Sequence, residues 1–393
     1  MLRSLAALIV ALFTLFASGE AQAYPWMIQH QYNTCSQCHV DPSGGSAMTA
    51  YGRAQTEALL RSDYGKPVED PGKIKDFAFG VVKLPKEVIA QVDVRGLLIP
   101  QPGNTRFLLM QSDLRGGVQT DKFIAYGSFG IVSEGALSAR VIDADQTANA
   151  VVVPVARDYW VGFRPTRSLT IRAGRINLPF GIRGDDHIRF TRAVTRTTTN
   201  ADQQLGVSTA FETRKVRGEV MAVAGNLQVS PDAFRERGYS GLVGWAPVKE
   251  VELGLSSLVL GSRNDILTLT RTTRQAHGVF VRASPVEKLA LLAEADVLVT
   301  GSGSGIARTT SPGFLLDAQA DWEAVRGLHL KAGGEFCDAS TSEEGSLGRG
   351  WGAVQWFFAP HVNLRVDAMY GPVNCVIGSR VGGIALAQIH AFL

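Results

Sequence analysis

The chain lacks long hydrophobic runs after its first twenty residues. Of 393 residues, only 5–18 form a nearly continuous apolar stretch. No later run approaches the roughly 18–20 apolar residues that a transmembrane helix needs. This excludes a helical membrane protein. It does not exclude a membrane β-barrel, whose strands need only about ten residues with every second one apolar.

An excess of charge of one sign is also absent. Lysine and arginine number 39 against 36 aspartates and glutamates, a formal net charge of +3. No basic stripe is interleaved with aromatic residues, so we expect no nucleic-acid partner. A hydrolytic triad, a phosphate-binding loop and a dinucleotide fingerprint are absent too, and the common enzyme classes that depend on them are not indicated.

The apolar stretch near the N-terminus has the features of an export signal. Arg3 precedes it, and Ala21-Gln22-Ala23 follows with small residues at both cleavage positions. We therefore predict a signal peptide over residues 1–23, with Tyr24 as the first mature residue. A retained N-terminal anchor is the alternative. In either case the protein leaves the cytoplasm.

Cysteine is scarce, with four residues in the chain, and two of them share a short motif. Cys35-Ser36-Gln37-Cys38-His39 has the spacing of a c-type haem attachment site, in which two thiols add to the haem vinyl groups and the adjacent histidine ligates iron. We predict one haem c held covalently by Cys35 and Cys38, with His39 as proximal axial ligand. A thioredoxin-like dithiol would require a βαβ surround that this sequence lacks.

A zinc site is the other rival interpretation, and it would require two further ligands close by. The remaining cysteines, Cys337 and Cys375, lie about 300 residues away. These two either form a disulfide or remain free thiols, because their separation in space cannot be read from sequence.

The second axial ligand is left open by the sequence. His30 and Met48 are the main candidates, with Met27 behind them, and an open sixth position is the alternative. Methionine ligation usually gives a higher potential than a pair of histidines. Tyr51 and Arg53 either pack against the haem edge and its propionates or are surface residues of a helix.

Beyond about residue 87 the sequence alternates with period two. Apolar residues at 88, 90, 92 and 94 alternate with a row that includes Asp93 and Arg95, and residues 289–299 and 362–370 follow the same pattern. Successive side chains of a strand point to opposite faces, so each segment has an apolar face and a polar face. Strands of this kind suit either a soluble sandwich, in which the polar face meets solvent, or a membrane barrel, in which it faces the lumen.

A recurring turn signature helps to count these strands. It appears at residues 164–169, 246–251, 284–289, 323–328 and 359–364, and short connections are also expected near 119–122 and 213–216. Aromatic residues precede most of these turns at one fixed offset (Phe163, Trp245, Trp322 and Phe358), as an interfacial girdle requires. Residues 384–393 end the chain inside a strand, as a barrel-closing strand would.

We therefore predict a mainly β fold: a transmembrane antiparallel β-barrel of about 16 strands over residues 76–393, preceded by a small, partly helical haem segment over 24–75. The count becomes 18 if residues 135–156 contain an additional pair. Residues 177–204 and 301–312 are expected to form outer loops. The predicted location is the outer membrane.

This layout resembles the fused monohaem cytochrome–porins of the bacterial outer membrane, which include outer-membrane iron oxidases. The resemblance is carried by the haem motif, by Tyr51-Gly52-Arg53, which is similar to the family's aromatic-Gly-Arg, and by residues 172–181, which look like a common porin segment. It implies a haem in or at the mouth of the lumen, accessible from outside, and a periplasmic c-type cytochrome as partner. Residues 41–45 are more glycine-rich than in the iron-oxidase branch, so the donor stays open.

Three functions follow as hypotheses. The first is an electron-transfer protein that moves single electrons between an extracellular donor, Fe(II) or a similar species, and the periplasm; whether it is an enzyme in the sense of an Fe(II) oxidase is left open. The second is a solute-conducting porin with the haem segment as a plug. The third is a secreted or periplasmic haem protein with a β-rich domain.

Overall fold

The computed structural model describes residues 24–32, 34–42, 44–62, 82–100, 103–134, 136, 152–184, 189–227, 229, 232–266, 268–303, 309–339, 345–375 and 381–392. The predicted signal peptide, residues 63–75 of the predicted haem segment and most of the region expected to contain an additional strand pair lie outside these residues. No helix in the described part of the chain is long and apolar enough to cross a membrane.

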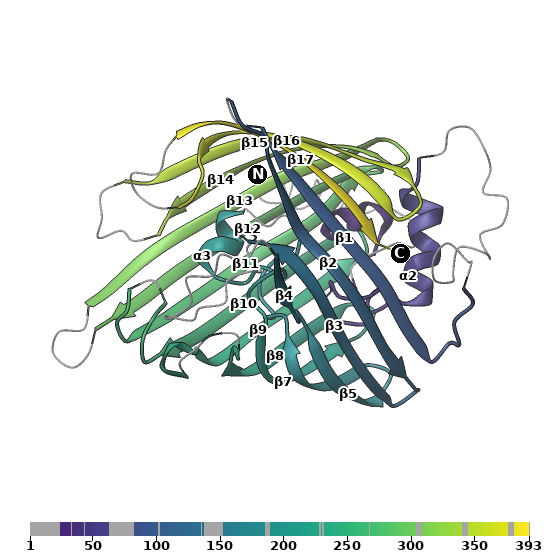
Figure 1. The fold of residues 1–393 in the computed structure, drawn as a ribbon, viewed down its shortest axis with the longest axis horizontal. Coiled ribbons are helices and arrows are strands. Elements are labelled where there is room, and N and C mark those ends of the chain that lie inside the picture. The colour runs from purple at the N-terminus through teal and green to yellow at the C-terminus, as the bar shows by residue number, and fades with distance from the viewer. Residues whose placement is uncertain are drawn as a thin grey trace, which may run out of the picture.

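The described strands form one closed antiparallel barrel (Figure 1). They are β1 (Val88–Ile99), β2 (Arg106–Gln119), β3 (Phe123–Ser133), β4 (Val152–Val155), β5 (Tyr159–Thr166), β6 (Leu169–Ile176), β7 (Gln204–Glu212), β8 (Val216–Gly225), β9 (Arg237–Val248), β10 (Val251–Ser262), β11 (Thr272–Val286), β12 (Leu289–Ser302), β13 (Thr309–Val325), β14 (Leu328–Asp338), β15 (Leu347–Ala359), β16 (Val362–Pro372) and β17 (Val381–Phe392). Strands that follow one another in sequence pair, except that β4 and β5 both pair with β3, and β1 pairs with β17.

The barrel has sixteen strand positions. β4 pairs with residues 130–133 of β3 and β5 pairs with residues 123–127, so the two segments occupy one position. The predicted antiparallel barrel of about 16 strands is therefore confirmed. The predicted closing strand is confirmed as well, since Asp93 pairs with Phe392 at the junction of β1 and β17.

The alternation read from the sequence divides the wall into two faces. In β12, Ala290, Leu292, Glu294 and Asp296 are buried toward the lumen, whereas Val297 on the other face is half exposed. Large apolar side chains on the outer face are strongly exposed, such as Phe107, Leu114 and Phe129 at 60%, 62% and 65%. The outer face that these side chains define matches a lipid environment.

This closed barrel with an apolar exterior is an outer-membrane barrel. Since an apolar surface of this extent needs lipid rather than water around it, the hypothesis of a soluble secreted or periplasmic protein is wrong. The pairing of β1 with β17 also covers the two strands that would otherwise be open sheet edges in the membrane.

Seven short connections lie at one end of the barrel, as predicted. They are residues 119–123, 166–169, 212–216, 248–251, 286–289, 325–328 and 359–362. Trp245 and Trp322 are each 51% exposed beside them, as members of the expected aromatic girdle. Short turns mark the periplasmic end of such barrels, so we refer to this end as the short-turn end and assign it to the periplasm.

The N-terminal segment lies inside the lumen at the short-turn end. It contains the 3-10 helix η1 (Pro25–His30), the helix α2 (Ala50–Gln55) and the π-helical turn η2 (Thr56–Leu60). Trp26 and Met27 pack with Phe357 and Phe392 in a buried cluster, and the amide of Ser62 donates to the carbonyl of Phe357. Figure 1 shows α2 beside the C-terminus at one end of the barrel. The segment thus lies in the lumen, one of the two places that the resemblance implies, at the end that we assign to the periplasm.

The segment between β6 and β7 also folds inward. Its apolar side chains Leu178, Phe180 and Phe190 are fully buried, the last in the short helix α3 (Phe190–Val194). Arg192 of α3 pairs with Glu294 on the barrel wall. Residues 177–204 connect β6 to β7 at the end opposite the short turns, as expected of an outer loop, but the described part of this loop folds into the lumen because its apolar residues and arginines bind to the lumen wall. The expected loop at 301–312 is shortened by β12 and β13, which extend to Ser302 and from Thr309.

Cys337 and Cys375 form a disulfide, with their Cα atoms 5.9 Å apart. It joins the end of β14 to the chain just after β16, opposite the short-turn end. The disulfide that the sequence left open is therefore present, and it is remote from the haem motif.

Candidate functional site

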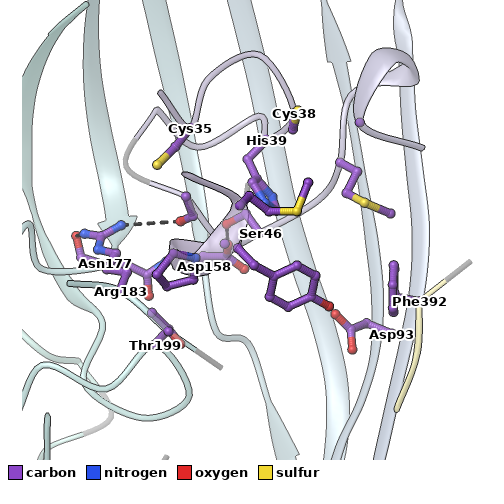
Figure 2. Close-up of a pocket in the computed structure, with 18 of the residues that line it drawn as sticks. Cys35, Cys38, His39, Ser46, Asp93, Asp158, Asn177, Arg183, Thr199 and Phe392 are labelled. Atoms are coloured by element: carbon purple, nitrogen blue, oxygen red, sulfur yellow. Dashed lines mark hydrogen bonds between the residues drawn. The ribbon is translucent and has the colours of Figure 1, made fainter. Parts of the chain in front are cut away.

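The haem motif folds as a single helical turn. The amides of Cys38 and His39 both donate to the carbonyl of Cys35, over 3.2 and 2.9 Å. This turn places Cys35, Cys38 and His39 on the wall of one cavity inside the barrel. Figure 2 shows the three side chains together above Ser46 and Asp158. The structure thus brings together the three residues that the sequence predicts to hold the haem.

A tight reversal follows the motif. The amide of Val40 donates to the carbonyl of Ala47 over 2.9 Å, and His39 and Met48 form an antiparallel bridge. Gly44 has a φ of +89°, in the left-handed region that glycine adopts readily. A Cβ atom at Gly44 would lie 3.4 Å from the sulfur of Cys35, so the glycine also keeps this side of the cavity clear.

Helix α2 packs directly on the motif backbone, and Gly52 makes this approach possible. A Cβ atom at Gly52 would lie 2.3 Å from the carbonyl oxygen of Cys38. Thr49 caps the helix by accepting from the amide of Gly52 over 3.0 Å, while its hydroxyl donates to the carbonyl of Gln37. Arg53 is buried and donates to the carbonyl of Met48 over 3.1 Å. These contacts give Tyr51-Gly52-Arg53 a structural basis: the glycine and arginine fix α2 against the motif.

The candidates for a second axial ligand separate in space. Met48 and Met27 line the same cavity as His39. His30 is not among the lining residues, and its Nε2 lies 3.3 Å from a carboxylate oxygen of Glu323 on β13. The geometry therefore favours a methionine over His30.

The cavity is rich in arginine, and the space between atoms within it and in its opening to solvent amounts to about 1410 Å³. Two aspartates line it, and so do six arginines: Arg95, Arg115, Arg157, Arg183, Arg217 and Arg282. Several of these arginines contact carboxylates, as Arg217 contacts Glu252 over 2.6 Å. The wall thus offers many guanidinium hydrogen-bond donors to an anionic ligand. Ion pairs with carboxylates already balance much of the positive charge of the wall.

The barrel wall holds the segment through polar contacts that sequence reasoning did not identify. Asp41 forms a buried ion pair with Arg172 of β6 over 2.9 Å. The amide of Met48 donates to Gln91 of β1 over 2.8 Å, and the amide of Ala47 to the hydroxyl of Tyr126 on β3 over 3.2 Å. The alternation with period two indicates that such residues face the lumen. It does not indicate which of them contacts which part of the segment.

Burial keeps both motif thiols protonated. It raises the pKa of the Cys38 thiol to about 12, with a smaller increase from the neighbouring Cys35. Burial likewise raises the pKa of Cys35, against the opposing effect of Arg217. A reactive dithiol requires a lowered pKa, because the thiolate is the nucleophile. The site is therefore unlike that of a disulfide oxidoreductase.

Comparison with known proteins relates the barrel to porins. No protein-family model matches the chain, and no curated protein is similar to it in sequence. Among solved structures, it is similar to in-vitro folded OmpT of Vibrio cholerae, with a TM-score of 0.56 and 9% identity over 78% of this chain and 97% of that one. It is also similar to the outer membrane channel DcaP of Acinetobacter baumannii, with a TM-score of 0.53 and 10% identity over 79% and 99% of the two chains.

A third similar structure is an anion-selective porin from Comamonas acidovorans, with a TM-score of 0.52 and 10% identity over 78% of this chain and 98% of that one. At such identities the likeness establishes the fold alone. About a fifth of this chain lies outside each match.

Proposed function

We propose that this protein is an outer-membrane electron-transfer protein that carries one haem c. The observation that carries the proposal is the placement of Cys35, Cys38 and His39 together on the wall of one cavity inside the lumen. In the family that the sequence resembles, this motif and a barrel occur in one chain. A bound haem would supply a one-electron iron couple, with the two cysteines as its covalent attachment and His39 as its proximal ligand.

The residues present fit such a group. Two thiols and one imidazole face a common cavity, and a methionine, Met48, lines it beside His39. The guanidinium groups on the wall suit the two propionates of a haem, since arginine and carboxylate form strong charge-assisted hydrogen bonds. Gly44 and Gly52 leave room where a side chain would press on Cys35 or on the backbone of Cys38. We propose Met48 as the second axial ligand.

The position of the segment sets the direction of the path. It lies at the short-turn end, so electrons leave toward the periplasm, where we propose a c-type cytochrome as partner. An extracellular donor, Fe(II) or a similar species, would have to enter the lumen from the opposite end, past the inward segment around α3. The bilayer core of about 30 Å separates these two ends.

Haem content tests the proposal. The protein is expressed with its signal peptide in a strain competent for c-type cytochrome maturation, and the outer-membrane fraction is purified. Covalent haem that survives denaturing electrophoresis, with a spectrum that changes on reduction, is the expected result. A haem-free protein from that strain would refute the proposal.

A second function, a solute-conducting porin with the N-terminal segment as plug, is favoured by a different observation. The barrel is similar in fold to solved porins, one of them anion-selective. Planar-bilayer conductance separates the two functions. Large, stable openings that persist when Cys35 and Cys38 are replaced by alanine would favour the porin, whereas a closed barrel favours electron transfer.

A further inference from the structure

The haem motif reaches the surface at the short-turn end. Gln37 is exposed, Ser36 and Cys35 are half-buried, and Cys38 is buried. The hydroxyl of Ser36 donates to a carboxylate oxygen of Glu212, the last residue of β7, over 2.8 Å. The middle of the motif therefore lies at the rim of the barrel beside the turn that joins β7 to β8.

Two neighbouring turns surround this surface with positive charge. Arg214 and Lys215 are exposed in the turn between β7 and β8, and they line a small cavity together with Thr34. Arg167 is exposed in the turn between β5 and β6, and it lines another cavity together with Ser36. All three basic residues thus lie close to the chain of the motif.

The short-turn end carries further exposed charged residues of both signs. Three exposed acidic residues are found there among the described residues: Glu87, Asp121 and Glu287. Seven exposed basic residues are found in the same set: Lys83, Lys86, Lys122, Arg167, Arg214, Lys215 and Lys288. Basic side chains thus outnumber acidic ones by four among the exposed residues that the structure describes at this end.

We propose that the surface formed by Gln37, Arg167, Arg214 and Lys215 is the docking site of a soluble periplasmic redox protein with an acidic face. This inference rests on the proposed electron-transfer function and specifies its exit. The motif is most accessible here, so a partner docked here has the shortest route to a group attached to Cys35 and Cys38. Opposite charge on the two surfaces raises the rate of encounter and orients the partner.

The test measures electron transfer from the reduced holoprotein, in detergent, to an oxidised soluble c-type cytochrome by stopped flow. One electron leaves the barrel haem and reduces the ferric probe. Two forms of the probe are compared: a lysine-rich cytochrome, and the same protein made acidic by succinylation of its lysines. We expect faster transfer to the acidic form, with a rate that falls as salt is raised, because salt screens charges beyond about 10 Å at 0.1 M.

A matched pair of variants locates the surface. Arg214→Glu together with Lys215→Glu should slow transfer to the acidic probe about tenfold at low salt. Lys83→Glu together with Lys86→Glu makes the same change of charge before β1, which lies five strand positions from β7 around the barrel, and should have little effect. Oxidation by a small uncharged quinone should be equal in both, which shows that the haem itself is intact.

Equal rates in the two double variants, or no preference between the two probes, would overturn the inference. It would also be overturned if the variants changed only the insertion of the protein into anionic bilayers, since the basic turns would then serve lipid headgroups. The outcome stays separable from failure of the proposed function, because an absent haem spectrum refutes that function before any rate is measured.

Discussion

Each barrel strand other than the short β4 is hydrogen-bonded to neighbours on both sides, whereas the N-terminal segment contacts the surrounding wall at separate points. Strands β11 and β12, for example, pair from Thr272 opposite Ser302 to Val286 opposite Leu289. The segment instead depends on contacts such as Asp41 with Arg172 and Met48 with Gln91. A single substitution should therefore affect the segment far more than the barrel.

The largest expected effect comes from the proposed haem attachment site. Replacing Cys35 and Cys38 together by alanine should abolish covalent haem, because no thioether bond can then form. Haem staining after denaturing electrophoresis measures this. The barrel should still fold, as judged by its heat-modifiable mobility on gels.

Replacing Cys337 and Cys375 by serine is the matched control. It removes the same number of cysteines, at the disulfide opposite the short-turn end. Haem content should stay at the level of the unchanged protein, and its loss in this variant would count against the specific role of the motif.

The next largest effect is expected from the buried ion pair between segment and wall. Asp41→Asn leaves Arg172 with Glu219 as its remaining carboxylate partner, so the cost should lie near the lower end of the roughly 3–5 kcal/mol typical of a broken buried pair. More frequent openings in planar bilayers would report the weakened segment. Asp232→Asn breaks exposed pairs with arginines and should have little effect, because water screens an exposed ion pair.

A smaller effect is expected at the helix crossing. In Gly52→Ala the new methyl group meets the carbonyl of Cys38, so α2 must shift away from the motif, at a cost of about 1–3 kcal/mol. The yield of haem-loaded protein should fall, with unchanged barrel content in circular dichroism. Gly350→Ala is the control, because nothing lies within 4 Å of its added Cβ atom; equal yields in the two variants would contradict this role for Gly52.

The smallest effect is expected on the ligation and the midpoint potential of the proposed haem iron. If Met48 is the second ligand, Met48→Leu removes the absorption band of methionine–iron ligation and lowers the midpoint potential, with little change in stability. His30→Ala should leave spectrum and potential unchanged, since His30 faces Glu323. The opposite pattern in a redox titration would assign the ligand to His30.

The same contrast explains what the sequence could predict. Period two, the seven turns and the terminal strand specify the barrel locally, because each strand repeats one rule about its two faces. The haem motif is recognisable because its spacing is chemically demanding. The position of the segment at the short-turn end, by contrast, depends on partners such as Arg172 and Tyr126, which lie more than seventy residues away in the chain.

The inward course of the segment after β6 was missed for a related reason. Its polar composition resembles that of a surface loop, and only Leu178, Phe180 and Phe190 mark it as a segment that packs. Three separated apolar residues have no periodicity from which burial can be read.

The N-terminal segment leaves the lumen at Ser62 and the barrel begins at Val88, both at the short-turn end. About two dozen residues therefore join the segment to the barrel. If a contact such as Asp41–Arg172 opens, the segment can leave the lumen only toward the periplasm and remains at an effective concentration in the millimolar range. The segment can then close the barrel again without a second molecule, and a group attached to the segment stays with its own barrel.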